Sequence, residues 1–121
     1  MIVGTLLLEL EIPGADSLKA KRQILRKVID RLRARFNASV AEVANNERWK
    51  VATIGVAVVA NSPSFVGEVL DKIFRAVDSV GELSITYYDR IIAPVAEYAD
   101  DEGPRNLAEY ERMLEEESDE S

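Results

Sequence analysis

The sequence predicts an α+β fold with a single hydrophobic core, because two kinds of hydrophobic periodicity alternate along it. Apolar residues recur at every second position, as in half-buried strands, over 2–12, 49–60 and 82–92. They recur at helical spacing over 17–36 and 63–80. A chain of 121 residues with 47% hydrophobic content is the right size for one domain.

The first predicted strand, 2–12, alternates between an aliphatic face and a face that ends in Glu9 and Glu11. Pro13 and Gly14 end this strand, because proline lacks the amide N–H of a strand ladder and both residues favour turns. The two glutamates are two positions apart and project from the same face. They either form a carboxylate pair for acid–base chemistry or for a hard cation, or are the solvated end of the strand, which we favour.

The first predicted helix follows Ser17, whose hydroxyl can accept a hydrogen bond from a free amide of the first turn. Its apolar side chains fall within an arc of roughly 140°, as in a helix that lies on a core. They are Leu18, Ile24, Leu25, Val28, Ile29, Leu32 and Phe36. Lys21 projects into this arc, and we expect its ammonium group to leave the core past the end of the helix.

This helix holds eight of the fifteen basic residues and one acid, Asp30, although the whole chain has a net charge of −7. The cations form two flanks beside the apolar arc. One flank is Lys19, Arg22, Arg26 and Arg33, and the other is Lys27, Arg31 and Arg35. Like charges three or four residues apart cost a few tenths of a kcal/mol per pair, so helix stability alone does not favour this pattern. An ordinary solvated face is the alternative to a binding surface.

A short mixed segment at 37–44 and a polar turn at 45–48 lead to the long apolar strand at 49–60. Trp49 lies at the mouth of the predicted hairpin. It either anchors a partner or covers the edge of the core with its indole N–H directed to water or to a carbonyl.

The second predicted helix begins after Ser62, with Pro63 at the first position, where its missing N–H costs nothing. Its apolar spacing continues to Gly81, which is typical of a helix C-terminus. In the last strand, 82–92, alternation predicts Leu83, Ile85 and Tyr87 on one side and Ser84, Thr86, Tyr88 and Arg90 on the other.

The resulting order of elements is strand, helix, strand, strand, helix, strand, which is the ferredoxin-like βαββαβ pattern. It predicts a four-stranded antiparallel sheet in the order 4-1-3-2 with both helices on one face. The first and third strands are then central, in agreement with their continuous apolar character. We expect this domain to cover residues 1–96.

The remaining segment, 97–121, carries eleven acids and two arginines, whereas residues 1–96 are close to neutral. Asn106 can cap a short amphipathic helix over about 106–116 that places Leu107, Tyr110 and Leu114 on one side. We expect the residues after this helix to be disordered. The acidic tail is expected to contact the basic helix and shield part of its charge, with a solvated appendage as the alternative.

Cysteine and histidine are absent from the sequence. Disulfides, thiol nucleophiles, thiolate metal sites and imidazole bases are therefore excluded. We predict no catalytic, cofactor-binding or metal-binding residues; an enzyme that uses carboxylates alone is the less favoured alternative. The apolar N-terminus lacks a basic leader, and no segment reaches the length of a membrane span, so a cytoplasmic protein is expected.

Several linked segments resemble the YlxP-like small bacterial proteins, a family of unknown function. They are DSLKAKR at 16–22, RFNASVAEV at 35–43, the single Trp49 and TIGVAVVAN at 53–61. The resemblance covers roughly residues 1–92. It implies a ferredoxin-like fold, an association with translation or ribosome assembly through the family's usual genomic neighbours, and no assigned catalytic residues.

The open face of the predicted sheet has aliphatic and small side chains on its central strands, without the aromatic platform on which RNA-recognition motifs stack bases. We therefore expect a non-enzymatic module that binds RNA or a ribosomal partner through phosphate contacts of the basic helix. A protein-interaction module that uses the basic helix or the apolar open face is the alternative. Because that face would be a large exposed apolar patch, we also expect a homodimer.

Overall fold

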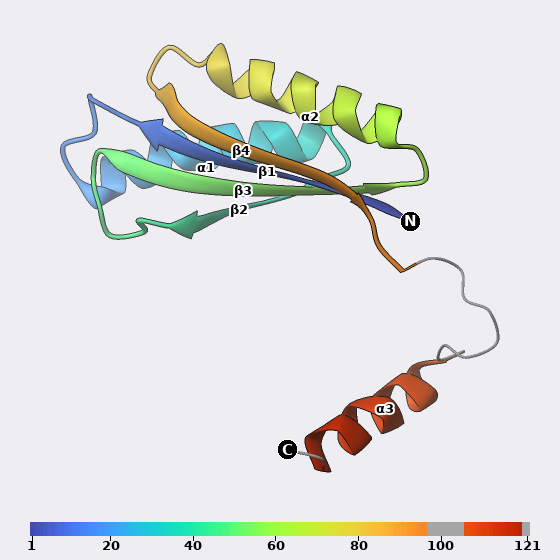
Figure 1. Cartoon of the computed structure of the whole chain (residues 1–121). Helices are drawn as coiled ribbons and strands as arrows, with labels where there is room; N and C mark the ends of the chain where they lie inside the picture. Colours follow the sequence, from blue (N-terminus) through green and yellow to red (C-terminus); the bar gives the residue numbers. More distant parts are fainter. Residues whose placement is uncertain (97–105, 120–121) are drawn as a thin grey trace.

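The computed structural model describes residues 1–96 and 106–119. Its elements are β1 (Ile2–Glu11), α1 (Leu18–Arg35), β2 (Ser39–Ala44), β3 (Val51–Ala60), α2 (Pro63–Asp78), β4 (Ser84–Pro94) and α3 (Leu107–Asp119). Four antiparallel strands form one sheet in the order β2-β3-β1-β4 (Figure 1). The predicted α+β fold and strand order are confirmed, with the two most continuously apolar strands in the centre.

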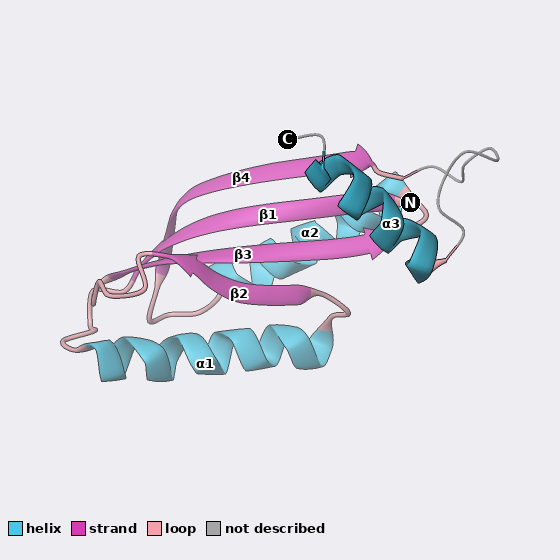
Figure 2. Cartoon of the chain, turned by 90° about the horizontal axis from the view of Figure 1, so that it is seen from below, coloured by secondary structure: helices cyan, strands magenta, loops and turns pink. Residues whose placement is uncertain are grey.

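Helices α1 and α2 cover one face of the sheet and leave the other face open. Helix α2 packs across β1, β3 and β4, whereas α1 packs on β2 and beside α2. In Figure 2, which looks onto the open face, the strands lie in front of α2, and α1 runs along the β2 side. Because α1 lies at this side of the sheet, only one stripe of it is buried, and its polar surface remains available to solvent.

The core lies between the sheet and these two helices. From β1 it receives Leu6, Leu8 and Leu10, which are almost completely buried. At Gly4 the helix α2 comes unusually close, because a Cβ atom there would lie 2.2 Å from Cγ1 of Val66. A residue without a side chain is therefore needed where α2 crosses β1.

Strand β4 departs from simple alternation. Its register with β1 shifts between Glu9 and Leu10, which leaves Thr86 as an extra residue whose hydroxyl donates to the carbonyl oxygen of Glu9 at 3.3 Å. Across this β-bulge, Tyr87 points to the open face and Tyr88 to the helix face. The alternation predicted for 82–92 is therefore wrong after Thr86, because one extra residue reverses the facing of all that follow.

Lys21 is fully buried, so the prediction that its ammonium leaves the core is wrong. Nζ donates to the carbonyl oxygens of Asn45 at 2.8 Å, Asn46 at 3.3 Å and Val51 at 3.2 Å. It also pairs with Oε2 of Glu42 at 3.0 Å. The β2–β3 hairpin turns at Asn45, whose φ of 60° is left-handed, and its carbonyl groups surround the ammonium. Lys21 therefore joins α1 to this hairpin.

Helix α3 begins after Asn106, whose Oδ1 accepts a hydrogen bond from the amide of Glu109 at 2.9 Å. It continues to Asp119, three residues beyond the helix expected at 106–116, because the glutamates at 115–117 are good helix formers. No Cα atom of α3 comes within 8 Å of another described helix or strand, and the helix stands apart from the sheet in Figure 1. The other part of the predicted tail, 97–105 and 120–121, lies outside the described residues.

None of the helices that the structure describes is long and apolar enough to cross a membrane.

Candidate polyanion-binding surface

Helix α1 is fixed at both ends and along one stripe. The hydroxyl of Ser17 accepts a hydrogen bond from the amide of Ala20 at 3.0 Å, as expected for an N-cap. The amide of Phe36 closes the last turn on the carbonyl of Leu32 at 2.8 Å. The stripe that includes Leu25 and Val28 is buried in the core. The remaining side chains are thus held on a rigid support that projects them into solvent.

All seven cations predicted as the binding surface are exposed: Lys19, Arg22, Arg26, Lys27, Arg31, Arg33 and Arg35. None of them forms an ion pair within residues 1–96 and 106–119; the two ion pairs found there join Lys21 to Glu42 and Arg90 to Asp71. The positive charge of α1 is therefore not neutralised by neighbouring acids in the described structure. We refer to these seven residues as the α1 cations.

The flank of Arg22, Arg26 and Arg33 faces β2. These side chains line a shallow groove between α1 and β2 together with Asp30 and Glu42. The guanidinium of Arg33 donates to the carbonyl oxygen of Val40 at 2.6 Å. Arg33 therefore also holds the sheet edge, whereas no such bond from the described residues restrains Arg22 or Arg26.

The other flank ends at Arg35, which reaches a hollow between α1 and α2. Its guanidinium carbon lies 5.1 Å from the centroid of the Phe36 ring, a cation–π distance. The hollow has a volume of about 650 Å³ and is called the α1–α2 pocket below. Its lining consists of Arg35, Phe36, Asn37, Val58, Val59, Phe65, Val69, Lys72 and Arg75.

Sequence reasoning missed Lys72 and Arg75 as members of a basic surface. In the sequence they appear as single charges on the polar side of the second helix, with no clustering to distinguish them. Only the packing of α2 beside α1 brings them to Arg35. A helical-wheel comparison of the two helices within the predicted fold could have suggested this proximity.

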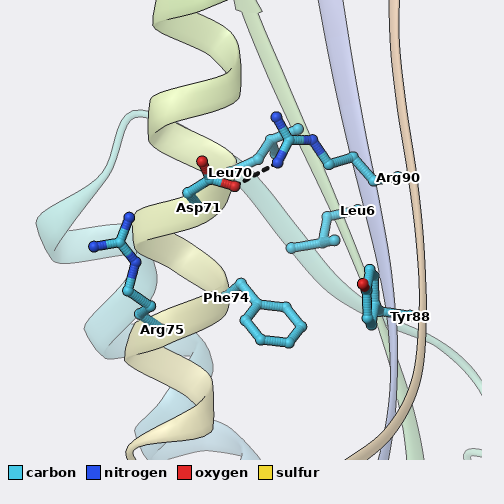
Figure 3. A pocket seen from close by; sticks show the side chains of 7 residues that line it. All are labelled: Leu6, Leu70, Asp71, Phe74, Arg75, Tyr88 and Arg90. Carbon is cyan, nitrogen blue, oxygen red and sulfur yellow. Dashed lines mark hydrogen bonds and ion pairs between the residues drawn. The ribbon is translucent and has the colours of Figure 1, made fainter.

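A second cleft lies between α2 and β4, and Figure 3 shows its lining. Phe74 and Tyr88 meet edge to face across it, with ring centroids 5.1 Å apart and planes inclined by 72°. At one rim the guanidinium of Arg90 pairs with the carboxylate of Asp71. These contacts join the exposed edge strand to the helix and neutralise Arg90. Arg75 lines this cleft as well as the α1–α2 pocket, so among the described residues the cleft adds no further unpaired cation to the basic surface.

The two other sequence candidates are not part of α1. Glu9 and Glu11 are on the open face of β1, opposite Thr53 and Val51 of β3. No group of three or more acidic, histidine or cysteine residues positioned to hold a metal ion is found within the described part of the chain. Trp49 is 53% exposed, so it leaves about half of its surface available at the hairpin.

The open face of the sheet combines apolar and acidic side chains. Val59 and Ile91 are 58% and 56% exposed, and Val43 and Tyr87 are similarly accessible. Acidic groups share this face, since Asp89 is paired with Leu7 in register and Glu9 lies two pairs further along. This face therefore differs in charge from the surface of α1.

Comparisons with known proteins agree with this fold. The model of the family described as "Protein of unknown function (DUF503)" matches residues 3–90. The "Uncharacterized protein YlxP" of Bacillus subtilis (strain 168) is 29% identical over 85 residues, which cover 70% of this chain and 92% of that protein. A de novo designed protein with a ferredoxin fold, solved by NMR, aligns with a TM-score of 0.50 and 14% identity over 88% of this chain and 98% of its own. The predicted resemblance to YlxP-like proteins is confirmed, and the chain belongs to the DUF503 family.

Proposed function

We propose that this protein is a non-enzymatic binding module that holds RNA by its phosphates along α1. The observation that carries this proposal is the set of seven exposed α1 cations, none of which is ion-paired within the described residues. Five of the seven are arginines, whose planar guanidinium groups can bind phosphate oxygens through two parallel hydrogen bonds.

The geometry of α1 supports contact with several phosphates at once. Side chains four residues apart on a helix, such as those of Arg22 and Arg26, are separated by about 6 Å along the axis. The rigid helix therefore presents a row of cations to one nucleic-acid backbone. Such contacts position the ligand without reading its sequence. An RNA or ribosomal partner would also agree with the association with translation that the YlxP-like resemblance implies.

Affinity for single-stranded RNA should fall steeply with salt. If about five phosphates are neutralised, the logarithm of the association constant should decrease with the logarithm of the salt concentration at a slope near −3.5. That slope corresponds to a loss of about 100-fold between 50 and 200 mM salt. Fluorescence anisotropy with a labelled oligonucleotide would measure it. A slope indistinguishable from zero would contradict phosphate binding.

An acidic partner protein is the competing ligand for the same helix, since a row of carboxylates attracts the same cations. Capture of partners from lysate with and without nuclease distinguishes the two. Partners lost after nuclease treatment support RNA, whereas an acidic protein retained in the presence of nuclease supports the alternative.

We further propose that two copies associate through the open sheet face, because Val59 and Ile91 expose more than half of their surface there. Light scattering at tens of micromolar should give about twice the chain mass of 13.5 kDa. Ile91→Lys should shift the protein to the monomer mass. Trp49→Lys, which changes an equally exposed apolar residue at the hairpin, should not. A monomeric wild-type protein would refute this interface.

A further inference from the structure

The α1–α2 pocket combines an apolar lining with a basic rim. Phe65 and Val69, one turn apart on α2, contribute apolar surface to the lining, with 54% of Phe65 accessible to solvent. Arg35, Lys72 and Arg75 bring three positive charges to the same pocket, and none of them is ion-paired in the described structure. A suitable ligand therefore presents apolar side chains flanked by carboxylates.

Helix α3 has this chemistry. Leu107, Tyr110 and Met113 recur at helical spacing and are exposed, with 70% of Leu107 accessible. Glutamates adjoin the stripe, because Glu111 follows Tyr110 directly and Glu109 precedes it. A helix of 13 residues is marginal without a surface to lie on, so packing of this stripe would also stabilise the helix itself.

Charge distinguishes the pocket from the open sheet face as the docking surface for α3. The open face is also apolar, but it carries Glu9, Glu11 and Asp89. Bringing the glutamates of α3 onto that face would oppose like charges, which disfavours association. In the pocket the same glutamates would meet three cations.

The chain leaves the domain at a point close to the α1–α2 pocket, so α3 can reach the pocket. Pro94 at the end of β4 is paired with Ile2, and Ile2 is paired with Ala60. Ala60 adjoins Val59 of the pocket, so the exit lies two strand spacings away, about 10 Å. The segment 97–105 can span up to about 30 Å when extended.

We propose that α3 docks intramolecularly in the α1–α2 pocket, with its apolar stripe on Phe65 and Val69 and its glutamates on Arg35, Lys72 and Arg75. A tethered segment is present at an effective concentration in the millimolar range, so even weak contacts suffice for partial occupancy. Docking itself does not depend on RNA binding. If the proposed function holds, docking also occupies Arg35 and makes α3 a competitor of RNA at that end of α1.

A single spin label tests the docking in the full-length protein. The sequence contains no cysteine, so Ala108→Cys provides one attachment point on α3, away from the apolar stripe. We expect the label to broaden the amide signals of Phe65, Val69 and Lys72. Broadening of Leu7 and Ile91 alone, or no broadening in the domain, would refute the proposal. Intramolecular docking would also be refuted if the broadening arose only between molecules, as measured by mixing spin-labelled protein with ¹⁵N protein that carries no spin label.

Two charge variants, made in the labelled protein, separate docking in the pocket from diffuse attraction to α1. Lys72→Glu with Arg75→Glu should abolish the broadening. Arg22→Glu with Arg26→Glu makes the same change in net charge at the β2 side of α1 and should leave it intact. Equal loss in both would overturn the assignment to the pocket.

A variant of the tail gives a test that does not alter the domain. Tyr110→Ser with Met113→Ser removes apolar surface from α3 and should also abolish the broadening of Phe65, Val69 and Lys72. Persistence of the broadening would refute the role of the apolar stripe. Because no RNA is present in these experiments, they can fail or succeed independently of the proposed function.

Discussion

Replacing Lys21 by Met should lower the free energy of unfolding by about 3–5 kcal/mol, the range found when one partner of a buried ion pair is removed. The substitution keeps most of the apolar stem. It removes an ammonium group that binds the carbonyl oxygens of Asn45, Asn46 and Val51 and pairs with Glu42. Those carbonyls would lose their donor, and a carboxylate that is only 17% exposed would lose its partner.

Urea denaturation followed by the fluorescence of the single Trp49, which adjoins the hairpin, would measure this loss. Lys19→Met is the matched control, because Lys19 is an exposed cation on the same helix, and its change should stay within about 0.5 kcal/mol. Adding Glu42→Gln to Lys21→Met should recover part of the stability by removing the unpaired charge. A Lys21→Met protein as stable as the Lys19→Met protein would show that the buried pair contributes little.

The partners of Lys21 also show what could not be predicted from the sequence. A lysine within the apolar arc of a helix is evident from periodicity, but its partners are not. The bonded carbonyls lie 24 to 30 residues further along the chain and belong to a hairpin whose shape depends on a left-handed Asn45. Backbone acceptors carry no signature in the sequence, so the usual escape of a lysine to solvent was the natural expectation.

The elements and their order were predictable, because each strand and helix has its own hydrophobic period and is bounded by turn or cap residues. The bulge at Thr86 was not predictable, because the residue types of an edge strand do not show where an extra residue interrupts the pairing. The exposure of the α1 cations was predictable, because all seven lie outside the apolar arc of one helix. Lys72 and Arg75 were missed because tertiary packing alone brings them to Arg35.

Reversing two α1 charges, with Arg22→Glu and Arg26→Glu, should weaken RNA binding by on the order of 100-fold at about 0.1 M salt. Each neutralised phosphate contributes about fivefold at this salt through counterion release, and the new glutamates add repulsion. The salt slope should become less steep by at least about 1.4, the share of two phosphates. Both arginines are exposed and neither is bound to the sheet edge as Arg33 is, so the fold should be retained.

The control for this variant must carry the same net charge. Arg48→Glu with Lys50→Glu meets this condition with two exposed residues of the hairpin, outside both α1 and α3. Affinity within a few fold of wild type in the control, together with the large loss in the α1 variant, would assign binding to the surface of α1. Equal losses would mean that RNA responds only to net charge.

The α1 variant should lose RNA yet keep α3 in its pocket, whereas Lys72→Glu with Arg75→Glu should release α3 and retain most RNA affinity. Opposite responses of these two variants would separate the RNA-binding surface from the α3-binding pocket on adjacent sides of one helix.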